Sequence, residues 1–102
     1  MKYQLVVQWP STSIKDYDAM IEVEGVLIER LSELHEVDGH DAGAGEVNIF
    51  IHTNDIGKAF DEVKAALQGE NLLAGARIAY REVNKSKYTV LWPDGLKEFN
   101  IV

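Results

Sequence analysis

The sequence predicts an α+β domain in which an antiparallel sheet carries two helices on one face. Three observations lead to this prediction. Apolar residues alternate with others over residues 2–9 and 47–53, the two-residue period of a half-buried strand. Apolar residues recur at helical spacing over residues 14–34 and 56–67. Short segments of turn-forming residues separate two pairs of expected strands.

The first strand covers residues 2–9, KYQLVVQW, and Pro10 ends it because proline cannot continue a sheet ladder. The first helix follows over residues 14–34, with the run Ser11-Thr12-Ser13 offering N-caps. Gly25 interrupts this helix at a cost of about 1 kcal/mol relative to alanine. We take this glycine as a mark of close packing on a neighbour.

A hairpin over residues 37–53 leads to the second helix, which is expected to begin after Thr53-Asn54-Asp55 and to stop at Gly69. Residues 76–83 and 87–93 form a second strand pair, and EFNIV (98–102) is a candidate for a short last strand. The first six elements, in this order, give the ferredoxin-like split βαββαβ arrangement. An extra C-terminal strand or hairpin completes the prediction.

Length and composition indicate one domain over residues 1–102. The chain is 46% hydrophobic, which suffices for a core without disulfides. It contains no cysteine, so a disulfide framework, a thiolate metal site and a cysteine nucleophile are excluded. We find no signal peptide and no apolar segment of about 20 residues that would span a membrane. The sequence therefore predicts a cytoplasmic protein with no membrane partner.

The formal charge of −7 comes from 17 acidic and 10 basic side chains. Because the basic residues are scattered singly, nucleic acid is not an expected partner. A protein with a basic face is an expected partner, since the acidic field would steer it in. A solvated acidic surface without any partner is the plainer interpretation.

The glycine-rich run DGHDAGAGE (38–46) fails three tests for a ligand loop. A calcium loop beginning at Asp38 would need glutamate at its twelfth position, where Ile49 stands. A dinucleotide loop needs a third glycine and a following helix, and a phosphate loop needs Gly-Lys-Ser/Thr. The run is therefore expected to be a turn between strands, near residues 42–44 or 42–46, in which glycine supplies positive φ.

Residue parity predicts which side chains share each face of the sheet. If the apolar half of strand 47–53 faces the helices, Val37 lies opposite Ile49 or in a register shifted by two. The other face, which has no helix above it, then carries the candidate ligand-binding residues. These are Asp38, His40, Glu46, Asn48, Phe50 and His52.

Histidines beside carboxylates can transfer protons or hold a divalent metal. His40 is expected opposite Glu46 or Asn48, and His40 and His52 are the candidates for general acid–base catalysis. We assign no catalytic residue and expect no metal and no cofactor, because no nucleophile stands in a recognisable motif. His35, at the exit of the first helix, is expected to cap or pack.

The runs VDGHDAGAGEVNIFI and YTVLWPDGL resemble small bacterial proteins of an uncharacterised family with a ferredoxin-like fold. The resemblance covers most of the chain and carries no known activity. Some members of the large ferredoxin-like group pair their sheets into dimers that hold small ligands or run oxygenase chemistry between them. This analogy implies a homodimer through the sheet face.

Three functions remain in competition. The first is a small acidic binding module, for example an immunity-type protein-interaction domain that neutralises a basic toxin. The second is a ligand-binding or enzymatic dimer that uses His40 and His52 on the open sheet face. The third is a structural subunit whose sheet face is covered by side chains. We favour the first, because every enzyme motif tested fails, and lean against an enzyme.

Overall fold

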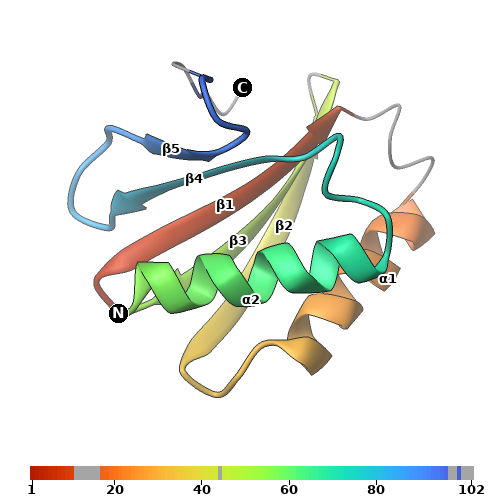
Figure 1. Ribbon diagram of the computed structural model, residues 1–102, viewed down its shortest axis with the longest axis horizontal. Coiled ribbons are helices and arrows are strands. Elements are labelled where there is room, and N and C mark those ends of the chain that lie inside the picture. Colours follow the sequence, from red (N-terminus) through yellow and green to blue (C-terminus); the bar gives the residue numbers. More distant parts are fainter. Residues whose placement is uncertain (11–16, 44, 97–98, 100–102) are drawn as a thin grey trace.

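The computed structural model describes residues 1–10, 17–43, 45–96 and 99 (Figure 1). It contains five strands and two helices in the described residues. In chain order they are β1 (Tyr3–Pro10), α1 (Tyr17–Arg30), β2 (His35–Gly43), β3 (Glu46–Thr53), α2 (Ile56–Gly69), β4 (Arg77–Glu82) and β5 (Thr89–Trp92). No helix of the described residues is both long and apolar enough to cross a membrane.

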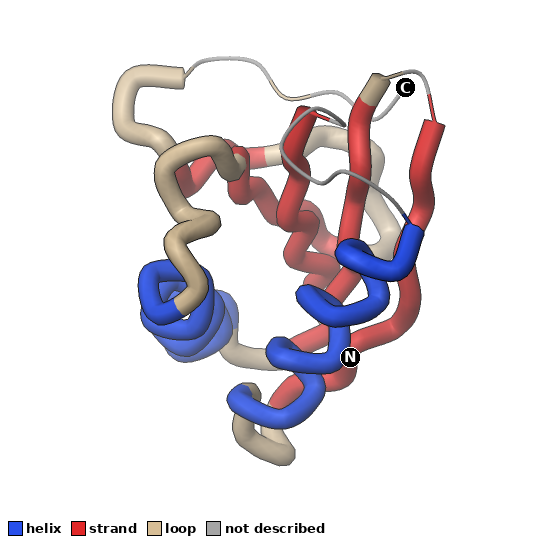
Figure 2. The backbone as a smooth tube through the Cα atoms, turned by 90° about the vertical axis from the view of Figure 1, so that its right-hand side faces the viewer, coloured by secondary structure: helices blue, strands red, loops and turns tan. Residues whose placement is uncertain are grey.

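The strands form one antiparallel sheet in the order β2-β3-β1-β4-β5. Figure 2 shows both helices on one side of this sheet, here called the helix face; the opposite side is the open face. α1 lies beside β2 and α2 beside β1. The predicted α+β class, the two helices and the extra strand after the sixth element are confirmed.

The alternating pattern predicted which residues face the helices, but Val6, Gln8 and Asn48 of the other face are buried as well. From β1, Leu5, Val7 and Trp9 are fully buried on the helix face, together with Ile49 and Ile51 of the neighbouring β3. The two helices cover them with buried Met20, Leu27, Val63 and Leu67. Full burial of such a side chain contributes roughly 1.5–3 kcal/mol, so this layer provides most of the stabilisation.

The helix ends differ in part from the sequence prediction. α1 is shorter than the range 14–34, ending at Arg30, and its expected N-caps lie outside the described residues. α2 begins as expected, because the side chain of Asp55 accepts a hydrogen bond from the backbone N–H of Lys58 at 3.1 Å. At its other end the left-handed residue is Asn71 (φ 58°), and Gly69 remains inside the helix.

Both tryptophans fix the loop between α2 and β4. The indole Nε1 of Trp9 donates to the carbonyl of Leu72 at 3.0 Å, and that of Trp92 donates to the carbonyl of Leu73 at 3.2 Å. Each indole thus packs its ring against the core while its one donor is satisfied. The two strands closed by a Trp-Pro dipeptide are therefore joined to the same loop.

The hairpin of β2 and β3 contains a β-bulge that the sequence analysis did not foresee. Val37 pairs with Ile51, as expected for the register shifted by two, but the register then slips between Val37 and Gly39. Gly39 has φ 137°, a conformation open to glycine at no steric cost. After the slip, His40 pairs with Ile49 and turns to the helix face.

The end of this hairpin differs in part from the prediction. Ala42 and Gly43, expected in the loop, pair with Val47 and Glu46, whereas Gly45 supplies a positive φ of 82° as expected of glycine. Most of the glycine-rich run is therefore not a turn: residues 38–43 belong to β2, and Glu46 begins β3.

The open face is partly covered by the chain itself. Val6 and Ala79, neighbours on β1 and β4, are fully buried beneath Phe99. Phe50, Tyr88 and Val90 pack around this cluster. The expectation of a bare face is therefore wrong along its middle. The predicted strand EFNIV falls largely outside the described residues, and Phe99 belongs to no strand.

Candidate functional site

Five of the six candidate ligand-binding residues lie on the open face, and they do not form one site. The five are Asp38, Glu46, Asn48, Phe50 and His52. Glu46 and His52 are six residues apart on β3, which separates them by roughly 20 Å at about 3.3 Å per residue. The apolar cluster of Val6, Ala79 and Phe99 lies between the two ends.

Each of these five side chains has its own local partner. His52 Nε2 lies 3.7 Å from Asp38 Oδ2, and Glu46 Oε2 lies 3.9 Å from Arg77 Nη1. Asn48 is buried and accepts a hydrogen bond of 3.0 Å from Gln8 Nε2 of β1. Phe50 packs against the apolar cluster. These contacts divide the five side chains between separate places on the open face.

The sixth candidate, His40, was placed on the wrong face. It does not lie opposite Glu46 or Asn48, because the bulge shifts the parity of β2 by one residue. Its Nδ1 instead lies 2.9 Å from Glu24 Oε2 of α1, with both side chains mostly buried. His40 thus joins β2 to α1, and in the described residues no three His, Cys, Asp or Glu side chains gather as a metal site.

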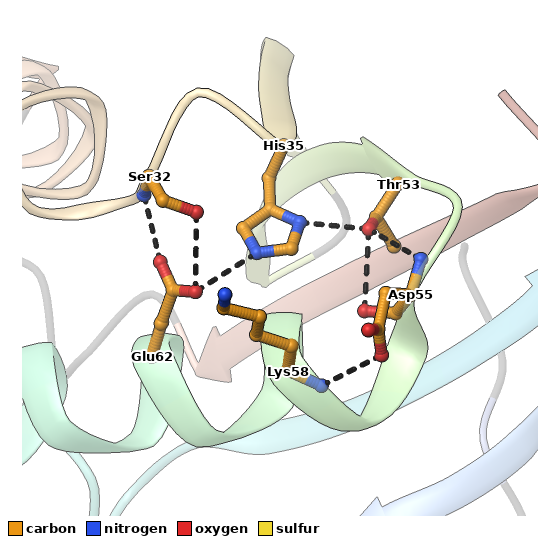
Figure 3. A network of polar contacts seen from close by, with 6 residues as sticks. All are labelled: Ser32, His35, Thr53, Asp55, Lys58 and Glu62. Atoms are coloured by element: carbon orange, nitrogen blue, oxygen red, sulfur yellow. Dashed lines mark hydrogen bonds and ion pairs between the residues drawn. The ribbon is translucent and has the colours of Figure 1, made fainter.

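His35, which was expected to cap or pack, is the centre of an extended polar network (Figure 3). Its Nε2 donates to the Glu62 carboxylate at 3.1 Å, and its Nδ1 lies 2.7 Å from the hydroxyl of Thr53. Glu62 also accepts from the backbone N–H and the hydroxyl of Ser32, at 2.7 and 3.2 Å. The network joins α2, β3 and the segment that follows α1.

The titration of Glu62 reflects this environment. Partial burial raises the pKa of its carboxyl, but the hydrogen bonds from Ser32 and His35, together with the charge of His35, lower it below the ordinary value. The ionised carboxylate is the form that the network selects, because it accepts every hydrogen bond aimed at it.

The network contains serine, histidine and glutamate, the residue types of a catalytic triad, but it lacks the triad's geometry. The Ser32 hydroxyl is hydrogen-bonded to Glu62 rather than to the imidazole. The His35 side chain has no exposed surface, so a substrate cannot reach the ring. A triad requires a nucleophile hydrogen-bonded to an accessible base. The role that fits these contacts is structural.

Charge is distributed very unevenly over the molecule, a feature that the sequence analysis missed. Residues 17–46 carry nine acidic side chains and one basic, a formal charge of −8, which leaves +1 for the rest of the chain. These residues form α1, β2 and their connections, which are adjacent in space. A charge count in a sliding window would have found this segment. We call it the acidic side.

The acidic side is accessible to solvent. Of its eight acidic residues whose side chains are described, six are exposed: Glu22, Glu29, Glu33, Glu36, Asp38 and Asp41. β2 is an edge strand, so Glu36, Asp38 and Asp41 lie along one edge of the sheet. Charged edge strands also prevent sheets from pairing edge to edge, which is the plainer role of such residues.

The opposite edge of the sheet is mildly basic. Arg81 on β4 donates to Gln4 through Nε and to the carbonyls of Glu82, Val83 and Lys85 through Nη1, at 2.9–3.3 Å. These bonds hold the connection between β4 and β5. An open depression of about 580 Å³ lies beside it, lined by Arg81, Val83, Asn84, Lys85, Ser86 and Tyr88.

No protein-family model matches this chain, and no curated protein matches its sequence. The structure is similar to one described as "De novo designed protein Foldit4", with a TM-score of 0.51 and 16% sequence identity. The match covers 84% of this chain and 100% of the designed one. At this identity the likeness shows the fold alone, and supports an α+β sheet with two helices.

Proposed function

We propose that the protein is an acidic protein-binding module whose acidic side engages a partner with a basic face. The observation that carries this proposal is the charge of −8 within residues 17–46, set against +1 over the rest of the chain. A net charge that serves only solubility needs no such separation. A concentrated field of one sign, in contrast, orients a partner and accelerates its encounter with one surface.

The exposed carboxylates are suited to this role because few of them are neutralised internally. Within the acidic side, Arg30 is the one basic side chain, and it lies 3.6 Å from Glu70 of α2. Glu24 is paired with His40, whereas Glu22 and Glu29 lie on the exposed surface of the same helix. A basic partner would therefore find carboxylates ready to pair.

An immunity-type inhibitor is one concrete form of this proposal: its carboxylates would cover the basic surface of a toxin. We also propose the ferredoxin-like arrangement for the fold, supported by the order β-α-β-β-α-β and by β1 lying between β3 and β4. Membership of a small bacterial family and a cytoplasmic location stay predictions of the sequence.

The alternative, a dimer that encloses a ligand between two open faces, has less support. It needs His40 and His52 in one cavity, and they lie on opposite faces. It also needs the face to be free, whereas Val6 and Ala79 are already buried beneath Phe99.

A charge-reversal experiment tests the proposal. The wild-type protein, tethered at its C-terminus, is incubated with lysate of the source cells at low salt, and carboxyl–amine cross-links are mapped by mass spectrometry. We expect one defined protein whose lysines are linked to carboxylates within residues 22–41. The variant Glu22→Lys/Glu29→Lys should lose this protein, and added salt should release it because screening shortens the Debye length to about 8 Å near 0.15 M.

The matched control is Asp61→Lys/Asp94→Lys, which changes the net charge equally at exposed positions outside the acidic side. It should retain the partner. Equal loss in both variants would show that net charge alone matters, and cross-links spread over the whole surface would contradict a defined acidic side.

A further inference from the structure

We propose that an exposed apolar ridge on α1, formed by Ile21, Gly25 and Ile28, is the docking surface for a basic amphipathic helix of the partner. This inference rests on the proposed function and goes further, because it names the contact surface and the secondary structure of its occupant. The three residues are spaced i, i+4 and i+7, so they share one flank of the helix.

Two ion pairs fix the orientation of α1. Arg30 reaches Glu70 of α2, so one flank of the helix faces α2. Glu24 reaches His40, so another flank faces β2. At about 100° per residue, Ile21, Gly25 and Ile28 lie next to Glu24 and on the far side from Arg30. The ridge therefore points away from α2, on the side of the edge strand.

The ridge is apolar, yet nothing in the described residues covers it. Ile28 is 60% exposed and Ile21 is 39% exposed, whereas Met20, Val23 and Leu27 of the same helix are buried. Leu34, just beyond the helix, is also exposed. Single exposed apolar residues are common, but aligned ones on one helix flank are typical of a helix-in-groove contact.

Gly25 provides an independent argument. A glycine within a helix destabilises it relative to alanine, so it is normally retained where another chain segment approaches closely. In the described residues there is no such segment, because outside the helix's own backbone and the two chain neighbours no atom lies within 4 Å of the position that a Cβ of residue 25 would occupy. Since φ at this position is ordinary for a helix, conformation does not require glycine either. Close approach of a partner's helix accounts for it.

The charges around the ridge determine the chemistry of the occupant. Glu22 and Glu29 are exposed beside it on the outer surface of α1. A second copy of this chain docked through the same ridge would bring these carboxylates together, and an anionic membrane would be repelled in the same way. A helix with an apolar stripe and lysine or arginine on its flanks can pack on the ridge and pair with Glu22 and Glu29 beside it.

The dimensions suit a helix–helix contact. Ile21 and Ile28 are seven residues apart, about 10.5 Å along the axis, or two turns. Isoleucines one above the other with glycine between them form a ridge with a notch. A partner side chain can enter this notch, and the helix axes can then approach to about 8 Å.

Three synthetic probes test the inference: a lysine-flanked amphipathic helical peptide of about 20 residues, its glutamate-flanked counterpart, and polylysine without an apolar seam. Binding to the full chain is measured by calorimetry at low salt, and contacts are mapped by ¹H–¹⁵N NMR. We expect the lysine-flanked peptide to bind and to shift the amides of Ile21, Gly25 and Ile28. We expect the glutamate-flanked peptide not to bind.

The variants Gly25→Ala and Ile28→Ser should each lower the affinity for the lysine-flanked peptide about tenfold. Two variants are the matched controls. Gly57→Ala replaces a glycine of α2, where the new Cβ would meet Asp55 at an ordinary 3.8 Å. Val83→Ser replaces an exposed apolar residue at the opposite edge of the sheet. Both controls should bind as the wild type does. Circular dichroism of each variant verifies that the fold is intact.

The outcomes separate this inference from the proposed function. If polylysine and the lysine-flanked peptide bind, but Gly25→Ala and Ile28→Ser change nothing, the acidic side stands and the ridge is refuted. If neither cationic probe binds, both proposals fail. Equal binding of the glutamate-flanked peptide would overturn the charge argument, and dimerisation that is lost in Ile28→Ser would identify a second copy as the occupant.

Discussion

The two helices lie on the same face of the sheet but are built differently. α2 is capped by Asp55, buries a continuous stripe and presents Lys64 over the rings of Phe60 and Trp92. α1 buries a stripe as well, yet it also contains a central glycine and leaves Ile28 largely exposed. It carries most of the excess negative charge together with β2.

This difference indicates that α2 is optimised for the fold, whereas α1 is a compromise. Several features of α2 have a reason within the molecule, among them its N-cap and the ion pair between Glu70 at its C-terminal end and Arg30 of α1. The glycine, the exposed isoleucines and the exposed carboxylates Glu22 and Glu29 of α1 have no such reason among the described residues. Residues that break local rules without an internal reason concentrate at functional surfaces.

The largest expected effect concerns the buried stripe of α2. Leu67→Ala removes a fully packed side chain from the core and should lower the free energy of unfolding by about 2–5 kcal/mol. Ile28→Ala on the ridge of α1 should change it by about 0.5 kcal/mol or less. Urea denaturation followed by circular dichroism measures both. A large loss for Ile28→Ala would mean that α1 uses its ridge for folding, which would remove the contrast.

The next effect concerns the polar network around His35, which joins α2, β3 and the segment that follows α1. Glu62→Ala removes the acceptor for Ser32 and His35 and should cost about 1–3 kcal/mol at pH 7. Glu70→Ala, at an exposed ion pair just beyond the last residue of α2, should cost about 0.5 kcal/mol or less and serves as the control.

The difference in stability between the wild type and Glu62→Ala should depend on pH, with a sign that follows from the pKa of Glu62. Because the pKa of Glu62 is lowered in the folded protein, its stabilisation is complete above the ordinary value of 4.5 and is lost as the pH falls through the lowered pKa. The stability difference between wild type and Glu62→Ala should therefore shrink below pH 4.5. A difference that stays constant to low pH would contradict the role assigned to the carboxylate.

A smaller effect is expected at the start of α2. Asp55→Ala removes the cap that accepts the Lys58 N–H and should cost about 1 kcal/mol. Asp61→Ala, an exposed position within the same helix, should be close to neutral. Equal effects from the two substitutions would show that charge, rather than the cap, stabilises this end.

The strands, both helices and the core follow from periodicity, because burial on one face imposes the alternation that is visible at Leu5, Val7 and Trp9. Periodicity does not predict the face on which His40 lies, because one extra residue at the bulge reverses the facing of all later residues of β2. Gly39 could have predicted the bulge, because glycine inside a strand often marks one.

Long-range polar contacts could not be read from spacing. His35 and Glu62 are 27 residues apart, and only the packing of α2 against the end of α1 brings them together. The acidic side could have been found in the sequence, but only by counting charges over residues 17–46 separately. The formal charge of this segment is −8, whereas the net charge of the whole chain is −7. Total charge conceals the asymmetry.

The measurement that tests the contrast between the helices most directly is made on Gly25→Ala, in one preparation, by denaturation and by calorimetry with the lysine-flanked peptide. A glycine retained for docking predicts opposite changes: the free energy of unfolding rises by about 0.5–1 kcal/mol, and the affinity falls. A variant that is more stable and binds the peptide as well as the wild type does would contradict the account.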